Sequence, residues 1–145
     1  MYHRYIDDAY GDYSIATLSN TPHQIENKTF TLTAGGPPLR ITGYVSYPLQ
    51  GRHYYKYGAS SGWAYVKIVD TDYTEPFNNG YTIRGLDKSK IITGQSVAGD
   101  SGGPYICREN SRWKLGGVHA GFDGTYTYST PLGLIIDKGF SPKID

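Results

Sequence analysis

The stretch GDSGGP at residues 99–104 is the most informative part of this sequence. It places Ser101 between glycines on a tight turn, which is the setting that an exposed nucleophile needs. Gly102 and Gly103 would let the backbone of a substrate come close. The backbone amides of Gly99 and Ser101 can point at one spot and stabilise a developing oxyanion. A polar hairpin turn is the plainer interpretation, since Ser and Gly are common turn residues.

The rest of the chain has the composition of a β protein. Its 145 residues suffice for one domain, or for one half of a two-lobed enzyme. It contains 19 Gly and 8 Pro, too many for a helix bundle, and 15 Tyr, often in runs with Thr, Val and Ile. Short strand-like stretches alternate with turn signals, which predicts an antiparallel barrel or sandwich. The predicted strands are 12–18, 28–33, 39–47, 52–57, 63–69, 81–84, 103–107, 112–119 and 125–128, with a short helix within 132–138.

Several classes of protein are disfavoured by composition. The net charge of +1 gives no electrostatic case for a nucleic-acid or anionic-membrane partner. The single cysteine, Cys107, excludes an intrachain disulfide and zinc sites built on paired cysteines. No apolar run reaches the roughly 18 residues that a membrane span needs. The first residues lack the apolar core of a signal peptide. We therefore expect no metal, no cofactor and no membrane span.

The string at 99–104 resembles the nucleophile loop of chymotrypsin-like serine proteases. Residues 40–44 (RITGY) resemble the strand that opens the second barrel of glutamyl endopeptidases, and residues 57–62 (YGASSG) resemble the turn that follows it there and in streptogrisin-like enzymes. The resemblance implies a chymotrypsin-like antiparallel Greek-key β-barrel and a serine endopeptidase that acts through an acyl-enzyme. Residues 1–33 would hold the end of the first barrel and the connection, and residues 34–145 the C-terminal barrel.

The segment from Asp12 to Ala16 (DYSIA) resembles the strand that carries the triad aspartate in this family. Asp12 would then hold a histidine tautomer and stabilise the imidazolium. Asp7 and Asp8 lie close by in the sequence, so the segment is a firmer choice than the residue. Asp12 could also simply end a turn after Gly11.

The string GGVHAG at 116–121 follows Ser101 by one hairpin. It resembles the specificity strand of glutamyl endopeptidases and of picornavirus-type, sobemovirus and arterivirus proteases. The resemblance implies that His119 donates to the side-chain oxygen of a Glu or Gln before the cut, with Ser96 as a partner hydroxyl. A lone histidine on a strand is more often structural. Tyr126 or Tyr128 could orient His119 from behind. The remaining predicted substrate-binding residues are Ala120, Gly121 and Phe122.

No histidine of this sequence has the position that the general base has in the family. His3 is too close to Asp12, while His23 and His53 follow it. The resemblance therefore implies that a His-bearing N-terminal fragment or chain completes the site, and that this chain alone is inactive on its peptide or protein substrate.

Two other functions stay open. A pseudoprotease or peptide-binding module would keep the fold without catalysis, and a carbohydrate-binding β-domain would suit Trp63 and Trp113. The compartment is not determined: the single cysteine favours a bacterial secreted enzyme, with a viral polyprotein protease as the alternative. Asp100 departs from part of the resemblance: many glutamyl and picornavirus-type enzymes lack an aspartate before the nucleophile, whereas trypsin-like and streptogrisin-like enzymes have one. If buried, it needs a cationic or amide partner.

Overall fold

A computed structural model of the chain describes residues 2–7, 10–16, 28–29, 39–76, 82–140 and 142. In the first three of these segments it describes the backbone alone, apart from the burial of Gly11. The turn expected at 78–80 lies outside the described residues, as do residues 30–33 of an expected strand.

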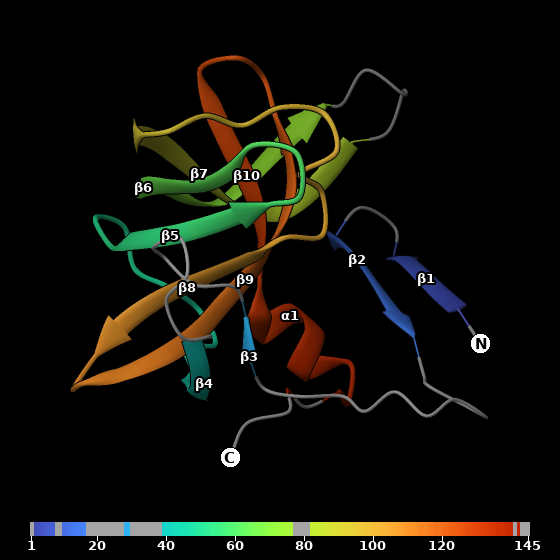
Figure 1. Cartoon of the computed structure of the whole chain (residues 1–145). Helices are drawn as coiled ribbons and strands as arrows, with labels where there is room; N and C mark the ends of the chain where they lie inside the picture. Colours follow the sequence, from blue (N-terminus) through green and yellow to red (C-terminus); the bar gives the residue numbers. More distant parts are fainter. Residues whose placement is uncertain are drawn as a thin grey trace.

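Six strands close into an antiparallel barrel in the order β7-β6-β5-β8-β9, with β10 bonded to both β7 and β9 (Figure 1). This confirms the predicted all-β, chymotrypsin-like barrel of about six strands. The barrel strands are β5 (His53–Gly58), β6 (Gly62–Pro76), β7 (Thr82–Thr93), β8 (Pro104–Glu109), β9 (Arg112–Phe122) and β10 (Tyr126–Pro131).

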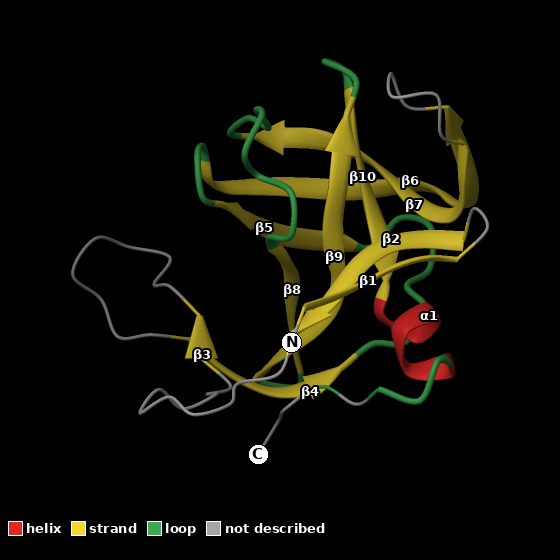
Figure 2. Cartoon of the chain, turned by 90° about the vertical axis from the view of Figure 1, so that its right-hand side faces the viewer, coloured by secondary structure: helices red, strands yellow, loops and turns green. Residues whose placement is uncertain are grey.

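Four further strands and a helix surround the barrel (Figure 2). β4 lies parallel to β9, and β3 pairs with β4. β1 and β2 form an antiparallel hairpin, which joins the barrel where Tyr10 pairs with Arg84 of β7. The short helix α1 follows β10 directly, within the range that the sequence predicts. These elements are β1 (Tyr2–Asp7), β2 (Tyr10–Ala16), β3 (Lys28–Thr29), β4 (Leu39–Tyr44) and α1 (Leu132–Asp137).

The sequence underestimates β7, of which only residues 81–84 are predicted. The strand continues to Thr93 and turns Asp87 and Ser89 into the protein, where both side chains are buried. A strand whose inward residues are polar has no alternation of apolar and polar residues to recognise. β6 likewise runs beyond its predicted end, through several irregularities in its pairing with β7. The strand β1 is not predicted by the sequence pattern at all.

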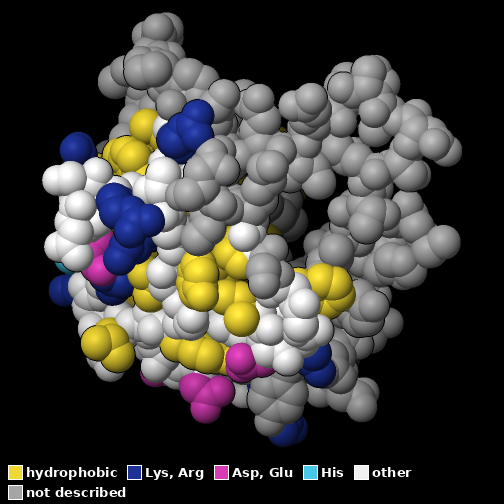
Figure 3. All heavy atoms as spheres, turned by 90° about the horizontal axis from the view of Figure 1, so that it is seen from below, with side chains coloured by type: hydrophobic (Ala, Val, Ile, Leu, Met, Phe, Trp, Pro, Cys, Tyr) yellow, Lys and Arg dark blue, Asp and Glu magenta, His cyan; other side chains and the backbone are white. Residues whose placement is uncertain are grey.

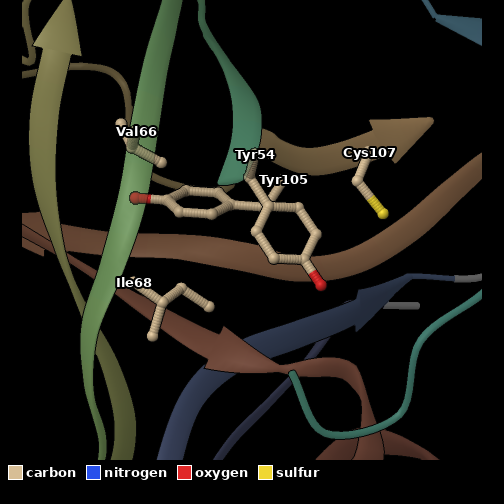
Figure 4. Packing of buried hydrophobic residues seen from close by; sticks show 5 residues of the cluster. All are labelled: Tyr54, Val66, Ile68, Tyr105 and Cys107. Carbon is tan, nitrogen blue, oxygen red and sulfur yellow. The ribbon is translucent and has the colours of Figure 1, made fainter. Parts of the chain in front are cut away.

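The apolar core fills the barrel interior. Tyr54, Val66, Ile68, Tyr105 and Cys107 pack together there, each at most 6% exposed, and the two tyrosine rings are 6.2 Å apart (Figure 4). Burial raises the pKa of the Cys107 thiol, so this cysteine is protonated and unreactive at neutral pH.

The outer surface carries several exposed hydrophobic side chains. Figure 3 views the end of the molecule where β4 and α1 lie in Figure 1, and hydrophobic groups gather there in patches among charged ones. The exposed large hydrophobic residues are Tyr44, Tyr47, Leu49, Ile92 and Phe122.

No helix of the described residues is long and apolar enough to span a bilayer.

The barrel interior also holds polar groups. Asp87 is 4% exposed, and it pairs across the strands with Ser129, which pairs in turn with His119. Ser89 Oγ and the Tyr54 hydroxyl are buried without a hydrogen-bond partner among the described residues. Burial raises the pKa of Asp87 to about 7. The folded chain therefore keeps a proton on Asp87 that the unfolded chain loses at a lower pH.

This raised pKa predicts a pH-dependent effect of Asp87→Asn. Between the ordinary carboxyl pKa and about 7, the free energy of unfolding falls as pH rises, because only the unfolded state releases the proton. The variant should be neutral within about 1 kcal/mol at pH 3, below the ordinary carboxyl pKa, where Asp87 is uncharged in both the folded and the unfolded state. At pH 8 it should be more stable than the wild type by up to about 4 kcal/mol. Urea unfolding at both pH values measures this, and an equal effect at both would contradict it.

Candidate active site

The loop that joins β7 to β8 presents Ser101 at the surface. Two backbone hydrogen bonds fasten this loop to β9: the Gly102 amide donates to the His119 carbonyl at 2.9 Å, and the His119 amide donates to the Gly103 carbonyl at 2.8 Å. Ser101 is exposed, and its Oγ lies 3.5 Å from the Ala120 carbonyl oxygen. Ser101, the predicted nucleophile, and Ala120, a predicted substrate-binding residue, are therefore neighbours.

Asp100, next to Ser101, is buried and heavily hydrogen-bonded. Its carboxylate accepts from the backbone amides of Ser60, Ser61 and Val97 at 3.1, 3.0 and 3.0 Å. The Ser61 hydroxyl and the Lys56 ammonium, the latter at 3.2 Å, complete the set. The sequence does not identify the partners of Asp100. The structure shows that Lys56 of β5 is the cationic partner, and that the amide partners belong to the β5–β6 turn and to the nucleophile loop itself.

The β5–β6 turn is shaped around this carboxylate. A Cβ on Gly58 would come within 2.1 Å of the Asp100 carboxyl group, so only glycine fits there. Gly99 has a φ of 96°, a conformation that favours glycine. A Cβ on Gly99 would also clash with the hydroxyl of Ser60, which belongs to the β5–β6 turn. Residues 58–62, predicted only as a turn, therefore hold the nucleophile loop in place.

Lys56 and Asp100 form a fully buried ion pair, with each side chain 0% exposed. Burial lowers the pKa of Lys56, and the contact with Asp100 opposes that shift. Burial raises the pKa of Asp100, but the hydrogen bonds from Ser61 and Val97 and the charge of Lys56 together hold it well below its usual range. Asp100 stays ionised and fixes the loop electrostatically.

Removal of one partner of this pair should be costly. Lys56→Met leaves the Asp100 charge buried with hydrogen bonds alone, and we expect a loss of about 3–5 kcal/mol in the free energy of unfolding. The double variant Lys56→Met/Asp100→Asn removes both charges and should recover much of that loss. A double-mutant cycle by urea unfolding tests the coupling, and additive effects would show that the two residues do not interact.

The ring of His119 lies inside the barrel, 2% exposed, between two hydroxyl groups. Nε2 is 3.2 Å from Ser96 Oγ, as the sequence expects. Nδ1 is 3.3 Å from the Tyr105 hydroxyl, which is 2.8 Å from Thr127 Oγ1. The Tyr105 ring also stacks on His119, with centroids 6.0 Å apart and an interplanar angle of 12°.

Tyr105 and not Tyr126 or Tyr128 therefore contacts the back of His119. The Tyr128 hydroxyl donates to Asp123 at 2.6 Å, and the Tyr126 ring carries the Lys88 ammonium at 4.2 Å from its centroid. The expectation that either would orient His119 is corrected. Alternation explains it: the Thr127 side chain contacts Tyr105, so Tyr126 and Tyr128, on either side of Thr127 in the strand, point the opposite way.

His119 is neutral at physiological pH. Burial, together with the nearby Lys56 charge, lowers its pKa to about 4, against the opposing charge of Asp100. A neutral imidazole carries one N–H, so one ring nitrogen donates and the other accepts.

The other predicted residues are less fully described. Neither the Gly99 nor the Ser101 amide donates to a backbone carbonyl of the described residues. Phe122 is 39% exposed at the end of β9. Asp12 lies in β2, but its side chain is outside what the structure describes; its neighbour Gly11 packs against Thr130 and Leu134.

Neither histidine whose side chain is described contacts Ser101. His119 is bonded to hydroxyl groups, and His53 stacks on Tyr65 with centroids 5.3 Å apart. His3 and His23 have no described side chain. No group of three or more His, Cys, Asp or Glu that could hold a metal ion occurs in the described parts of the chain.

The two tryptophans pack together around one tyrosine. The Trp63 and Trp113 rings lie 6.4 and 6.0 Å from that of Tyr55 in edge-on arrangements. An open groove of about 470 Å³ adjoins this cluster, lined by Arg52, His53, Tyr55, Tyr65, Cys107 and Arg108. Trp63 and Trp113, which suggested a carbohydrate-binding domain, are half-buried in this cluster.

Several solved structures that share this fold are serine proteases or viral proteases. Cellulomonas bogoriensis chymotrypsin aligns with a TM-score of 0.75 over 93% of this chain and 69% of its own, at 20% identity. The chain has the chymotrypsin-like protease fold. A protease described as glutamic acid specific, with a histidine triad in substrate binding, aligns with a TM-score of 0.75 over 94% of this chain and 70% of its own, at 17% identity.

More distant neighbours with the same fold include a viral enzyme. The NS6 protease of murine norovirus aligns with a TM-score of 0.55 over 72% of this chain and 61% of its own, at 14% identity. The chain spans 55% of the length of Thermobifida fusca protease A, which is 25% identical over the aligned part. No protein-family model matches the sequence, and no curated protein matches it.

Proposed function

We propose that this chain is the nucleophile-bearing part of a serine endopeptidase. The observation that carries the proposal is the position of Ser101: exposed, beside the Ala120 carbonyl, on a loop that Asp100 anchors to the β5–β6 turn. The chymotrypsin-like fold supports it. A serine held at the surface while its neighbour is buried in a dense set of hydrogen bonds is a preorganised nucleophile.

In the proposed reaction, Ser101 Oγ attacks the scissile carbonyl and forms an acyl-enzyme. The amides of Gly99 and Ser101 stabilise the oxyanion, since neither has a carbonyl partner among the described residues. Asp12 orients the general base, a histidine supplied from outside the described part of the chain. Without that base Ser101 should be nearly inert.

The nucleophile has a direct kinetic test. In the enzyme completed with its histidine-bearing part, Ser101→Ala should lower kcat on the order of 10⁶-fold. Ser60→Ala, on the neighbouring turn, keeps the Ser60 backbone amide and should change kcat less than about tenfold. A Ser101→Ala enzyme as active as the wild type would refute the proposal. An inactive wild type that still binds peptides would favour the pseudoprotease.

We further propose cleavage after Gln or Glu, read by His119 and Ser96. Tyr105 and Thr127 form a hydroxyl relay behind the ring, and both hydroxyls can rotate. In the structure Tyr105 donates to Thr127 Oγ1. Rotation of both hydroxyl groups, so that Thr127 donates to Tyr105 and Tyr105 donates to Nδ1, places the imidazole proton on Nε2, beside Ser96. That N–H and the Ser96 hydroxyl then suit a side-chain oxygen of the substrate.

The exposed histidine His53 provides a control for the substitution of His119. His119→Ala and Ser96→Ala should each lower the preference for Gln and Glu over Ala or Leu before the cut, by at least about tenfold. His53→Ala should leave it unchanged. Peptide-library profiling measures all three. A preference for Arg, Lys or aromatic residues, unchanged in the His119 and Ser96 variants, would show that His119 is structural.

The lowered pKa of His119 sets the pH dependence. An ordinary histidine would lose its charge near pH 6.5, and cleavage after Glu would weaken relative to Gln above that pH. Because the pKa is about 4, His119 is already neutral at pH 6, and the Glu-to-Gln ratio of kcat/KM should stay flat from pH 6 to 8. A fall in that ratio centred near pH 6.5 would contradict a neutral His119.

A further inference from the structure

The turn between β4 and β5 carries the sequence Leu49-Gln50-Gly51 at the surface. Leu49 is 79% exposed, the highest value among the exposed large hydrophobic residues that the structure describes. Gln50 and Gly51 are exposed as well. The bond after an exposed glutamine at a loop tip is accessible, and the proposed enzyme cuts after Gln or Glu.

The other Gln and Glu residues of the described chain are poorly placed for cleavage. Glu75 precedes Pro76 within β6, and a proline after the scissile bond lacks the amide proton and obstructs the approach. Glu109 is held by Arg52 and by Lys114 at the end of β8. Gln95 is exposed, but its carbonyl, the group that a nucleophile would attack, accepts a hydrogen bond from the Ser61 hydroxyl.

Few contacts hold the turn in place. The Arg52 amide donates to the Leu49 carbonyl at 3.2 Å, and the Gly51 amide donates to the Ile68 carbonyl at 2.8 Å. The Tyr47 hydroxyl is bonded to Asp137 of α1, a helix of six residues. Pro48 is the buried residue of the segment. Opening of such a short segment costs much less than global unfolding.

A chain cannot bring this bond to its own Ser101. The turn lies at the start of β5, whereas the end of β5, at Gly58, adjoins Asp100. The five steps from His53 to Gly58 alone span about 17 Å at about 3.3 Å each. Lys56, bonded to Asp100, keeps β5 fixed in this direction. Cleavage therefore needs a second copy.

We propose that the Gln50–Gly51 bond is a self-cleavage site, cut by a second copy of the enzyme; this rests on the proposed function. Ser101 Oγ of the attacking copy forms an ester with the Gln50 carbonyl carbon, and the C–N bond to Gly51 breaks. The serine proton passes through the general base to the leaving amine of Gly51. Water then hydrolyses the ester, which frees Ser101 and leaves a carboxylate on Gln50.

The cut chain stays assembled. β4, on the N-terminal product, pairs in parallel with β9 on the C-terminal product, and the Val45 amide donates to the Leu115 carbonyl at 2.8 Å. The Gly133 amide donates to the Ser46 carbonyl at 2.6 Å. Asp12 would then reside on one product, and Ser101 and His119 on the other.

The test incubates the complete, histidine-containing enzyme and follows it by intact mass spectrometry. We expect products that end at Gln50 and begin at Gly51, at a rate that rises with the square of enzyme concentration. Gln50→Glu should still be cut, whereas Gln50→Asn should slow the cut about 100-fold or more. Ser101→Ala should be stable alone but cut at the same bond when active enzyme is added.

A synthetic peptide of residues 47–54 separates the two levels of the proposal. An enzyme that cuts this peptide after Gln50 but leaves the folded chain whole would overturn self-cleavage and leave the proposed function standing. Cleavage of Gln50→Asn as fast as the wild type would likewise overturn self-cleavage at this bond alone. An enzyme that cuts no Gln or Glu peptide at all would overturn both self-cleavage and the proposed Gln or Glu specificity.

Discussion

The buried carboxylate of Asp100 is the group on which the candidate site depends. It joins three separate parts of the chain: Lys56 of β5, the turn at 58–62, and its own loop through the Val97 amide. A buried charge with so many donors is stable only if every donor stays in place. The same constraint that satisfies Asp100 therefore fixes the backbone before Ser101, and the hydrogen bonds of Gly102 and Gly103 with His119 fix the backbone after it.

The interior of the barrel carries a row of polar groups next to the candidate site. His119, Tyr105 and Thr127 form a chain of hydroxyl and imidazole contacts, and Asp87 and Ser129 lie in the adjoining cross-strand row. These groups replace apolar packing with hydrogen bonds of modest net value. The apolar cluster of Tyr54, Val66, Ile68, Tyr105 and Cys107 supplies the hydrophobic burial of the same interior.

The sequence predicts the fold and the main neighbours of the site where local patterns are strong. The string at 99–104, the turn at 58–62 and the spacing of Ser96, Ser101 and His119 all carry a local signal. Tyr105 escapes prediction as the partner of His119 because its role depends on the register between β8 and β9, which sequence spacing does not reveal. The extent of β7 is missed because its inward positions are polar, and Lys56 because a lysine within a strand is normally exposed.

The central claim is that Ser101 is an activated nucleophile once its general base is supplied. A fluorophosphonate probe tests this directly, since it bonds only to a serine that a neighbouring base activates. The probe should be applied to the complete enzyme and the modified residue located by peptide mass spectrometry. A single adduct on Ser101, lost in Ser101→Ala, is the predicted result. An unmodified Ser101 in a correctly folded, histidine-containing enzyme would contradict the account.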